Sequence, residues 1–209
     1  MTKSTLIFSF LMLIGCWTVL AQTSPASQKI SNRNIVPTFK QKDTAYWAEN
    51  FRQFRDAIFQ KDKGKAKAFF DFPIVDSSNE IWYLVYNQDD KSIEKLRDIV
   101  KPFTESDFHK YFGKLFSVDF VKSILKLKTD ELFKKGSYQT PEIKVGSTTY
   151  VLYATFDKST GGLELNFASD TELEDGKGEL LDAGEFNIIY FFVITRKGHV
   201  KFKQIRLAG

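Results

Sequence analysis

After Gly136 the prevailing spacing of apolar residues changes from that of helices to that of strands. On the N-terminal side, apolar residues recur every three or four positions, which is the period of an amphipathic helix. The clearest example is the run Trp47, Phe51, Phe54 and Ile58. On the C-terminal side, apolar and polar residues alternate, which is the period of a strand. Helices followed by strands predict an α+β fold.

Capping and turn signals divide the two halves into elements. Asp43 or Thr44 can cap the first helix, Thr104 with Asp107 has the spacing of a capping box, and Ser117 can cap a later helix. That later helix is expected to bury Val118, Val121, Ile124 and Leu125. Further helices are expected over residues 65–70, over 92–100 and in a last turn that ends at Gly136. Strands are expected over residues 81–86, 142–145, 148–156, 162–167, 185–195 and 199–207. Short turns between the later strands predict an antiparallel meander, within a single domain over residues 41–209.

The beginning of the chain has the pattern of a secretory signal. Lys3 precedes an apolar run over residues 6–20, and small residues stand before the boundary between Ala21 and Gln22. The apolar run is shorter than the roughly 20 residues that a membrane-spanning helix needs. We therefore expect a signal peptide over residues 1–21, cleaved after Ala21, and an exported protein that is periplasmic or secreted.

Cys16 leaves a second interpretation of this segment open. Residues 13–16 have the form of a bacterial lipobox, in which Cys16 would carry a lipid and hold the protein at a membrane. We favour the simpler interpretation, in which Cys16 is a small apolar residue of the signal, because residues 17–20 stay apolar after it. Residues 22–40 are polar, without a period, and are expected to form a flexible linker.

Composition excludes several kinds of chemistry. Cys16 is the only cysteine, so a chain cleaved after Ala21 has neither disulfides nor thiol chemistry. The formal net charge of +4 falls only to +3 without Lys3, and basic and acidic residues are interspersed, which argues against nucleic-acid binding. His109 and His199 lack metal-ligand spacing, so no metal or other cofactor is expected.

The acidic segment over residues 170–179 does not match a calcium loop, because its glycines stand at the wrong positions. We expect it to be a solvated hairpin loop.

Residues 185–195 are apolar on both faces of the predicted strand, with Phe191 on one of them. An antiparallel strand with one solvated face alternates apolar with polar residues, so both faces here must be covered. Helices can cover one face. The other is explained either by a central position within one subunit or by a homodimer through the Phe191 face, and the sequence leaves both open.

Catalytic motifs are missing from the sequence. No nucleophile elbow and no phosphate-binding glycine loop is found. Isomerase-type acid/base chemistry would need a carboxylate and a tyrosine in an apolar pocket. Tyrosines that could supply the phenol are Tyr83, Tyr150, Tyr153 and Tyr190. Glu49 and Asp56 lie off the apolar stripe of the first helix and are expected to face water.

Three segments give the chain its resemblance to a known superfamily. They are the helix WAENFRQFRDAI over residues 47–58, the segment FDFPI over 70–74, and the closing strand GHVKFKQI over 198–205. Over most of residues 43–207 the chain resembles the nuclear-transport-factor-two-like superfamily, in the version found as small exported bacterial proteins. The resemblance implies N-terminal helices packed on a curved antiparallel sheet in a cone, often with a pocket and often dimeric. Ketosteroid isomerase, dehydratases and pure binding modules share this fold, so the fold alone does not decide the function.

From these features we predict an exported, non-catalytic module that binds an unknown small apolar ligand or a protein partner. The alternative is an isomerase- or dehydratase-like enzyme on a small apolar substrate. No catalytic, metal or cofactor residues are assigned. Candidate residues for lining an aromatic pocket are Trp47, Phe54, Tyr83, Tyr150 and Tyr190.

The processing of the N-terminus can be tested directly. Expressed in a bacterium with its full N-terminus, the protein should be recovered from outside the cytoplasm with Gln22 as its first residue, because the signal pattern ends at Ala21. Mass spectrometry of the purified chain measures this. A chain that begins at a lipid-modified Cys16 would instead establish the lipobox interpretation.

Overall fold

The computed structural model describes residues 41–86, 91–174, 180–195 and 197–209. The predicted signal peptide, its cleavage site at Ala21 and Gln22, Cys16 and the linker over 22–40 therefore lie outside the described residues. Within the described residues, no helix combines the length and the hydropathy needed to cross a bilayer.

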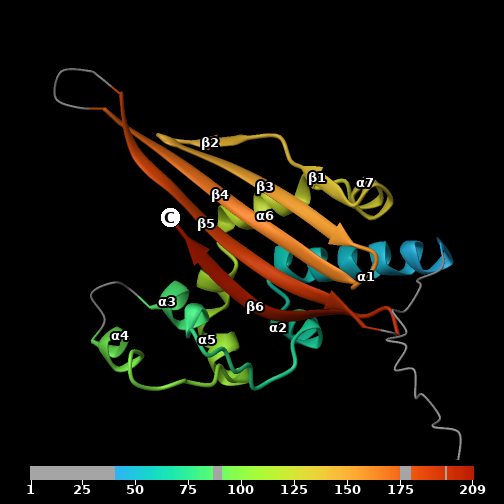
Figure 1. The fold of residues 1–209 in the computed structure, drawn as a ribbon, viewed down its shortest axis with the longest axis horizontal. Helices are drawn as coiled ribbons and strands as arrows, with labels where there is room; N and C mark the ends of the chain where they lie inside the picture. Colours follow the sequence, from blue (N-terminus) through green and yellow to red (C-terminus); the bar gives the residue numbers. More distant parts are fainter. Residues whose placement is uncertain (1–40, 87–90, 175–179, 196) are drawn as a thin grey trace, which may run out of the picture. The chain divides into compact units, whose positions relative to one another are not determined.

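The N-terminal part of the fold is helical (Figure 1). Its elements are α1 (Gln41–Phe59), α2 (Lys63–Ala66) with the 3₁₀ turn η1 (Lys67–Phe69), α3 (Glu80–Val85), α4 (Ser92–Lys95), α5 (Glu105–Leu115), α6 (Val118–Leu125) and α7 (Thr129–Lys135). The predicted stripe on α1 is confirmed, because Trp47, Phe51, Phe54 and Ile58 are each at most 2% exposed. The predicted cap is wrong: α1 begins at Gln41, ahead of Asp43 and Thr44.

Three of the predicted helix boundaries are confirmed by their capping contacts. Thr104 and Asp107 form a reciprocal capping box at the start of α5. The Ser117 hydroxyl accepts a hydrogen bond from the Phe120 N–H at the start of α6. Gly136 ends α7 with a φ of 89°, a left-handed conformation that glycine adopts without steric cost.

The predicted strand over residues 81–86 is wrong, because these residues form helix α3. The Asp76 carboxylate accepts from the Glu80 N–H at 2.9 Å, which supports a helical start there. Ile81, Trp82 and Val85 are buried while Tyr83 is 36% exposed, which is a helical pattern of burial and not a strand's alternation.

Helix α4 is also shorter than the predicted helix over residues 92–100. The cause is Asn79, which is buried and hydrogen-bonded to the backbone of the following segment. Its Nδ2 donates to the carbonyls of Leu96 and Ile99 at 2.9 Å and 2.6 Å, and its Oδ1 accepts from the Lys101 N–H at 2.9 Å. These bonds satisfy backbone groups that a longer helix would have paired internally.

The C-terminal part is an antiparallel sheet (Figure 1). Its strands are β1 (Ser137–Gln139), β2 (Ile143–Val145), β3 (Thr148–Asp157), β4 (Gly162–Glu174), β5 (Leu180–Ile194) and β6 (Val200–Ala208). They are ordered β1-β3-β4-β5-β6, and β2 also pairs with β3. The predicted meander and α+β class, helices packed on a curved antiparallel sheet, are confirmed. Strand β1 was not predicted, and the acidic segment begins as strand, because β4 continues to Glu174; residues 175–179 lie outside the described residues.

Aromatic rings fill the space between the helices and the inner face of the sheet, the face that carries Tyr190 and Phe192. The Phe54 ring centroid lies 5.2 Å from that of Phe69, 5.8 Å from Phe116 and 5.1 Å from Phe192, so α1 meets η1, the end of α5 and β5 at one point. Edge-to-face pairs at such distances stabilise a core beyond the area that they bury.

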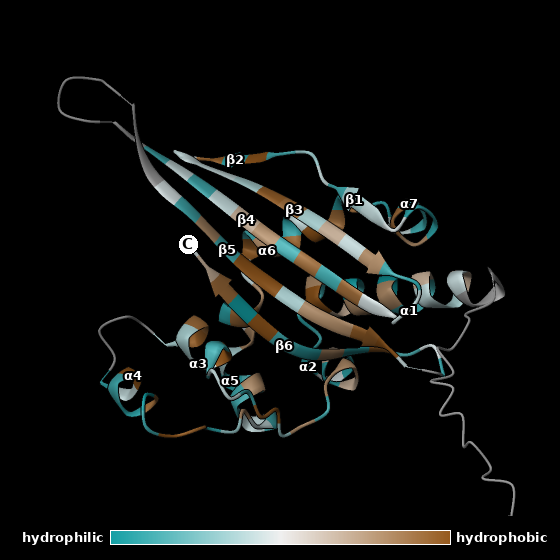
Figure 2. Ribbon diagram, viewed as in Figure 1, coloured by the Kyte–Doolittle hydropathy of each residue, from teal (hydrophilic) through white to brown (hydrophobic). Residues whose placement is uncertain are grey.

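Strand β5 lies between β4 and β6. In Figure 2 hydrophobic colouring continues along most of β5, whereas β4 alternates between hydrophobic and hydrophilic residues. Its inner residues Tyr190, Phe192 and Ile194 are buried. Ile189, Phe191 and Val193 lie on the other, outer face and are half-buried. In the view of Figure 1 none of the described helices crosses that outer face. The central position of β5 thus accounts for part of its two-sided hydrophobicity.

Two phenylalanines of α1 should differ sharply in their contribution to stability. Phe54→Ala is expected to lower the free energy of unfolding by about 3–5 kcal/mol, because it leaves a cavity among the rings. Phe59→Ala is expected to change it by only about 0.5 kcal/mol, since that side chain is 57% exposed. Chemical denaturation of both variants measures the difference, and equal losses would contradict this assignment of the core.

Candidate functional site

Helix α6 carries apolar residues beyond the part of its surface that packs on the core. Phe120 and Ile124 are fully buried against the core. Val118, by contrast, is 62% exposed and Leu125 is 37% exposed, so the prediction that these two are buried is wrong. A surface helix normally turns one apolar stripe to the core and polar residues to solvent. The outer side of α6 is therefore an apolar surface that needs an explanation.

That surface forms one wall of a groove, which we call the apolar groove. It has a volume of about 490 Å³ and lies between the C-terminal end of α1, helix α5 and helix α6. Its lining residues are Ile58, Phe59, Lys61, Lys63, Phe112, Gly113, Phe116, Val118, Val121, Lys122 and Leu125. The exposed side chains of Phe59, Val118 and Leu125 thus come from two separate helices to the same groove. Large exposed apolar residues gathered in this way are typical of a binding site.

The charged residues that line the apolar groove are all lysines. Lys122 forms an ion pair with Asp119 at 2.9 Å. The Lys63 ammonium donates to the His109 carbonyl oxygen at 2.7 Å and lies 6.0 Å from the Phe112 ring centroid, so it reaches from α2 to α5. Lys61 has a φ of 55° in the turn that ends α1, and its backbone N–H donates to the Ile58 carbonyl.

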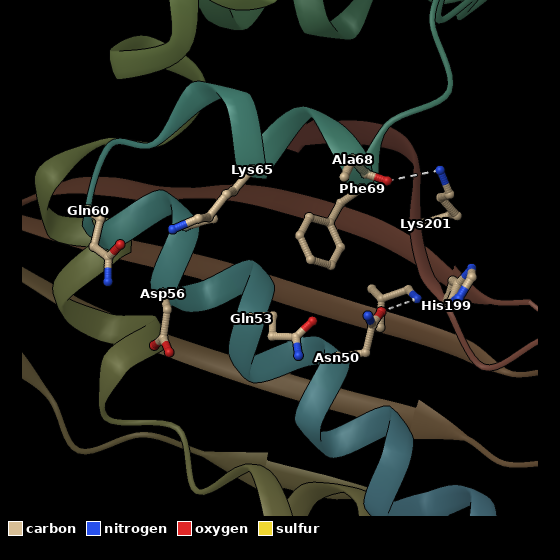
Figure 3. Close-up of a pocket in the computed structure, with 11 residues that line it drawn as sticks. Asn50, Gln53, Asp56, Gln60, Lys65, Ala68, Phe69, His199 and Lys201 are labelled. Carbon is tan, nitrogen blue, oxygen red and sulfur yellow. Dashed lines mark hydrogen bonds between the residues drawn. The ribbon is translucent and has the colours of Figure 1, made fainter.

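A second groove, the polar groove, lies on another side of α1 (Figure 3). It has a volume of about 630 Å³ and is formed by α1, α2 with η1, and the start of β6. Its lining residues are Asn50, Gln53, Asp56, Ala57, Gln60, Lys65, Ala68, Phe69, His199, Val200 and Lys201. Figure 3 shows Lys65 extending from α2 towards α1, whose amide and carboxylate side chains line the opposite wall.

Several polar groups of the polar groove hold the fold together. The Asn50 Oδ1 accepts from the Val200 N–H at 2.7 Å, which ties α1 to β6. Lys201 donates to the Ala68 carbonyl at 3.0 Å and to the Asp71 carboxylate at 2.8 Å, as Figure 3 shows for the first of these bonds. Asp56 and His199 are both exposed, in agreement with their predicted positions on the solvent side of the helix and at a turn. The geometry of this groove is explained by these structural contacts.

The five predicted pocket residues lie apart from both grooves. Trp47, Phe54 and Tyr190 are buried within the aromatic core. Tyr150 is half-buried and stacks on Phe167 with a centroid distance of 5.4 Å. Tyr83 is on α3 and is partly exposed. The structure therefore brings Trp47, Phe54 and Tyr190 into one core and leaves Tyr83 outside it.

The Tyr190 hydroxyl has a structural partner, since it donates to the Leu115 carbonyl oxygen at 2.8 Å. Burial raises the pKa of this phenol well above its usual range, because the charged form would lose its hydration. Among the described side chains, the buried polar or charged residues are Asn79, Ser123, Thr129 and Thr140, and none of them is an acid. In the same part of the chain, no three His, Cys, Asp or Glu side chains gather as a metal site.

Sequence reasoning missed the apolar groove because it placed Val118, Val121 and Leu125 in the core together with Ile124, and it did not name Phe120, which is fully buried. One signal could have revealed it. Val118, Val121 and Leu125 follow the i, i+3, i+7 spacing of one helix face, while Phe120 and Ile124 lie on another. Together they make an apolar face that is wider than the part that Phe120 and Ile124 turn to the core.

Comparisons with known proteins add little to this geometry. No protein-family model matches the chain, and no curated protein sequence matches it. Among solved structures, the chain is similar to a "putative ketosteroid isomerase" from Shewanella frigidimarina NCIMB 400, with 9% sequence identity and a TM-score of 0.30. The match covers 78% of this chain and 94% of that chain. A likeness of this degree carries no conclusion about activity or ligand.

Proposed function

We propose that this protein is an exported, non-catalytic binding module of the nuclear-transport-factor-two-like class, periplasmic or secreted, that takes a small apolar ligand in the apolar groove. The signal pattern over residues 1–21 supports export. If Cys16 carried a lipid, the same module would work at a membrane surface.

The observation that carries this proposal is the solvent-facing apolar side of α6, set opposite the exposed ring of Phe59. Sites for small molecules are concave, mostly apolar and about 300–1,000 Å³ in volume. The apolar groove meets each of these conditions with a volume of about 490 Å³. The rings of the core, in contrast, contact each other, which makes the grooves between helices the better place for a ligand.

The alternative, an isomerase- or dehydratase-like enzyme, has less support. Such chemistry uses a carboxylate beside a tyrosine in an apolar pocket. Among the side chains that the structure describes, no acid is buried, and the buried Tyr190 hydroxyl already donates to a backbone carbonyl. We therefore favour binding without catalysis.

As a protein partner we propose a second copy of the same chain, which would form a homodimer through the outer face of the sheet. Ile189, Phe191 and Val193 lie together on that face of β5, where a solvated antiparallel sheet would place polar residues. The Arg206 guanidinium of β6 lies 5.5 Å from the Phe191 ring centroid and covers only part of it. A second copy would remove the rest of this surface from water.

Ligand binding in the apolar groove can be tested with dodecyl-chain probes below their micellar concentrations. Calorimetric titration of the folded protein with dodecanoate and with dodecan-1-ol should detect binding of at least one of them. The double variant Phe59→Ser, Val118→Ser should lose that binding, because it removes the two most exposed apolar side chains of the groove. Val100→Ser is the matched control, since it changes an exposed valine outside the groove and should bind as the original protein does. No binding of either probe, or equal binding by the groove variant, would contradict the proposed site.

The proposed dimer can be tested by light scattering. Phe191→Asp should convert dimers to monomers, because two carboxylates would be buried in the interface without partners. Val145→Asp, an equivalent change on the exposed strand β2, should leave the mass unchanged. If the original protein is a monomer, or if Phe191→Asp stays dimeric, the outer face is not the interface.

A further inference from the structure

We infer that the ligand of the apolar groove is a single-chain anionic amphiphile, such as a free fatty acid. Its alkyl chain would lie along α6, and its negative head group would meet Lys61 and Lys63. This inference rests on the proposed function and adds the chemical class of the ligand to it.

The first argument is the charge around the groove. Three lysines line it and no acidic residue does. Lys122 is neutralised by Asp119, but neither Lys61 nor Lys63 forms an ion pair with a carboxylate of the described residues. The adjacent acid, Asp62, is engaged elsewhere: it caps α2 through the Lys65 N–H and lies 3.3 Å from the Lys65 ammonium. Two uncompensated cations beside an apolar surface favour a ligand with an apolar body and an anionic end.

The second argument is that the Lys63 ammonium is held at the groove and that the backbone of Lys61 is fixed beside it. The Lys63 ammonium is fixed by its hydrogen bond to the His109 carbonyl, and it retains donors for an anion because a lysine ammonium has three. Lys61 is placed by the turn that closes α1, where the Ile58 carbonyl accepts its backbone N–H at 3.2 Å. A cation positioned in advance, as the Lys63 ammonium is, loses less entropy when an anion binds.

The third argument is the shape of the apolar wall. Val118, Val121 and Leu125 follow one side of α6 over about 10 Å, given the rise of an α-helix. A stripe of this form matches an extended alkyl chain. A protein partner would need an interface of roughly 1,000 Å² or more, whereas this groove is a small concave site between helices.

The inference can be tested with three probes that share a dodecyl chain and differ in the charge of the head group. Dodecanoate is anionic, dodecan-1-ol is neutral, and dodecyltrimethylammonium is cationic. Calorimetric titration of the full mature protein, below the micellar concentrations and at mildly alkaline pH, should give a dissociation constant for dodecanoate about tenfold lower than for either of the others.

Two double variants with equal changes of net charge then show whether the preference for dodecanoate depends on Lys61 and Lys63. Lys61→Gln, Lys63→Gln should remove the preference for dodecanoate and bind all three probes with similar affinity. Lys95→Gln, Lys203→Gln removes two exposed lysine charges outside the apolar groove and leaves the ion pair of Asp62 with Lys65 intact, so it should keep the preference. Thermal unfolding of each variant verifies that it is folded.

The outcomes separate this inference from the proposed function. Equal affinity of the original protein for dodecanoate and dodecan-1-ol would overturn the inferred head group and leave a neutral apolar ligand in place. Loss of the preference in the control variant would also overturn it, because the effect would then be net charge and not position. Binding to vesicles of anionic lipid without binding to free dodecanoate would overturn it in favour of a membrane surface. If none of the three probes binds, the proposed function itself fails.

Discussion

The packing of aromatic rings around Phe54 is the interaction on which the rest of this structure depends. The Phe54 side chain contacts rings from η1, from the end of α5 and from β5, so it joins the helical part to the sheet. The only cysteine in the sequence is Cys16, so no disulfide can take over this role within the described residues. Stability must come from burial, and rings bury more apolar surface for each residue than other side chains do.

The same packing decides where a ligand can bind. Because the rings between the helices and the inner face of the sheet contact one another, the two grooves described above lie at the margin of this packing. Helix α1 separates them. Its one side meets the polar groove, where bonds such as that of Asn50 to Val200 hold α1 to the sheet. Its C-terminal end meets the apolar groove, where Phe59 and Val118 remain exposed. The polar side chains of the polar groove thus serve the fold, whereas the apolar groove has exposed apolar side chains that the fold does not explain.

Much of the fold could be predicted from the sequence because local signals and tertiary packing agree. The α1 stripe, the capping box at Thr104 and the strand meander after Gly136 are confirmed for this reason. Residues 81–86 were predicted wrongly, since a short apolar run rich in β-branched and aromatic residues suits a strand as well as a buried helix. The Asp76 carboxylate accepts from the Glu80 N–H, and the Asn79 side chain accepts from the Lys101 N–H, and these contacts favour helix α3. Intrinsic strand and helix propensities do not include such contacts.

The candidate site could not be predicted in the same way. The period of the apolar residues and the cysteine count do not depend on packing, so the class of fold and the exclusion of disulfides within residues 41–209 could be predicted from the chain alone. The apolar residues of α6 were evident in the same way, but not which of them would be covered. Packing between elements places Val118 and Leu125 at a groove and Phe120 and Ile124 in the core, and it brings Lys61 and Lys63 beside that groove. A side chain is buried only when another part of the protein covers it, and for α6 the covering residues come from elements that are distant in the sequence.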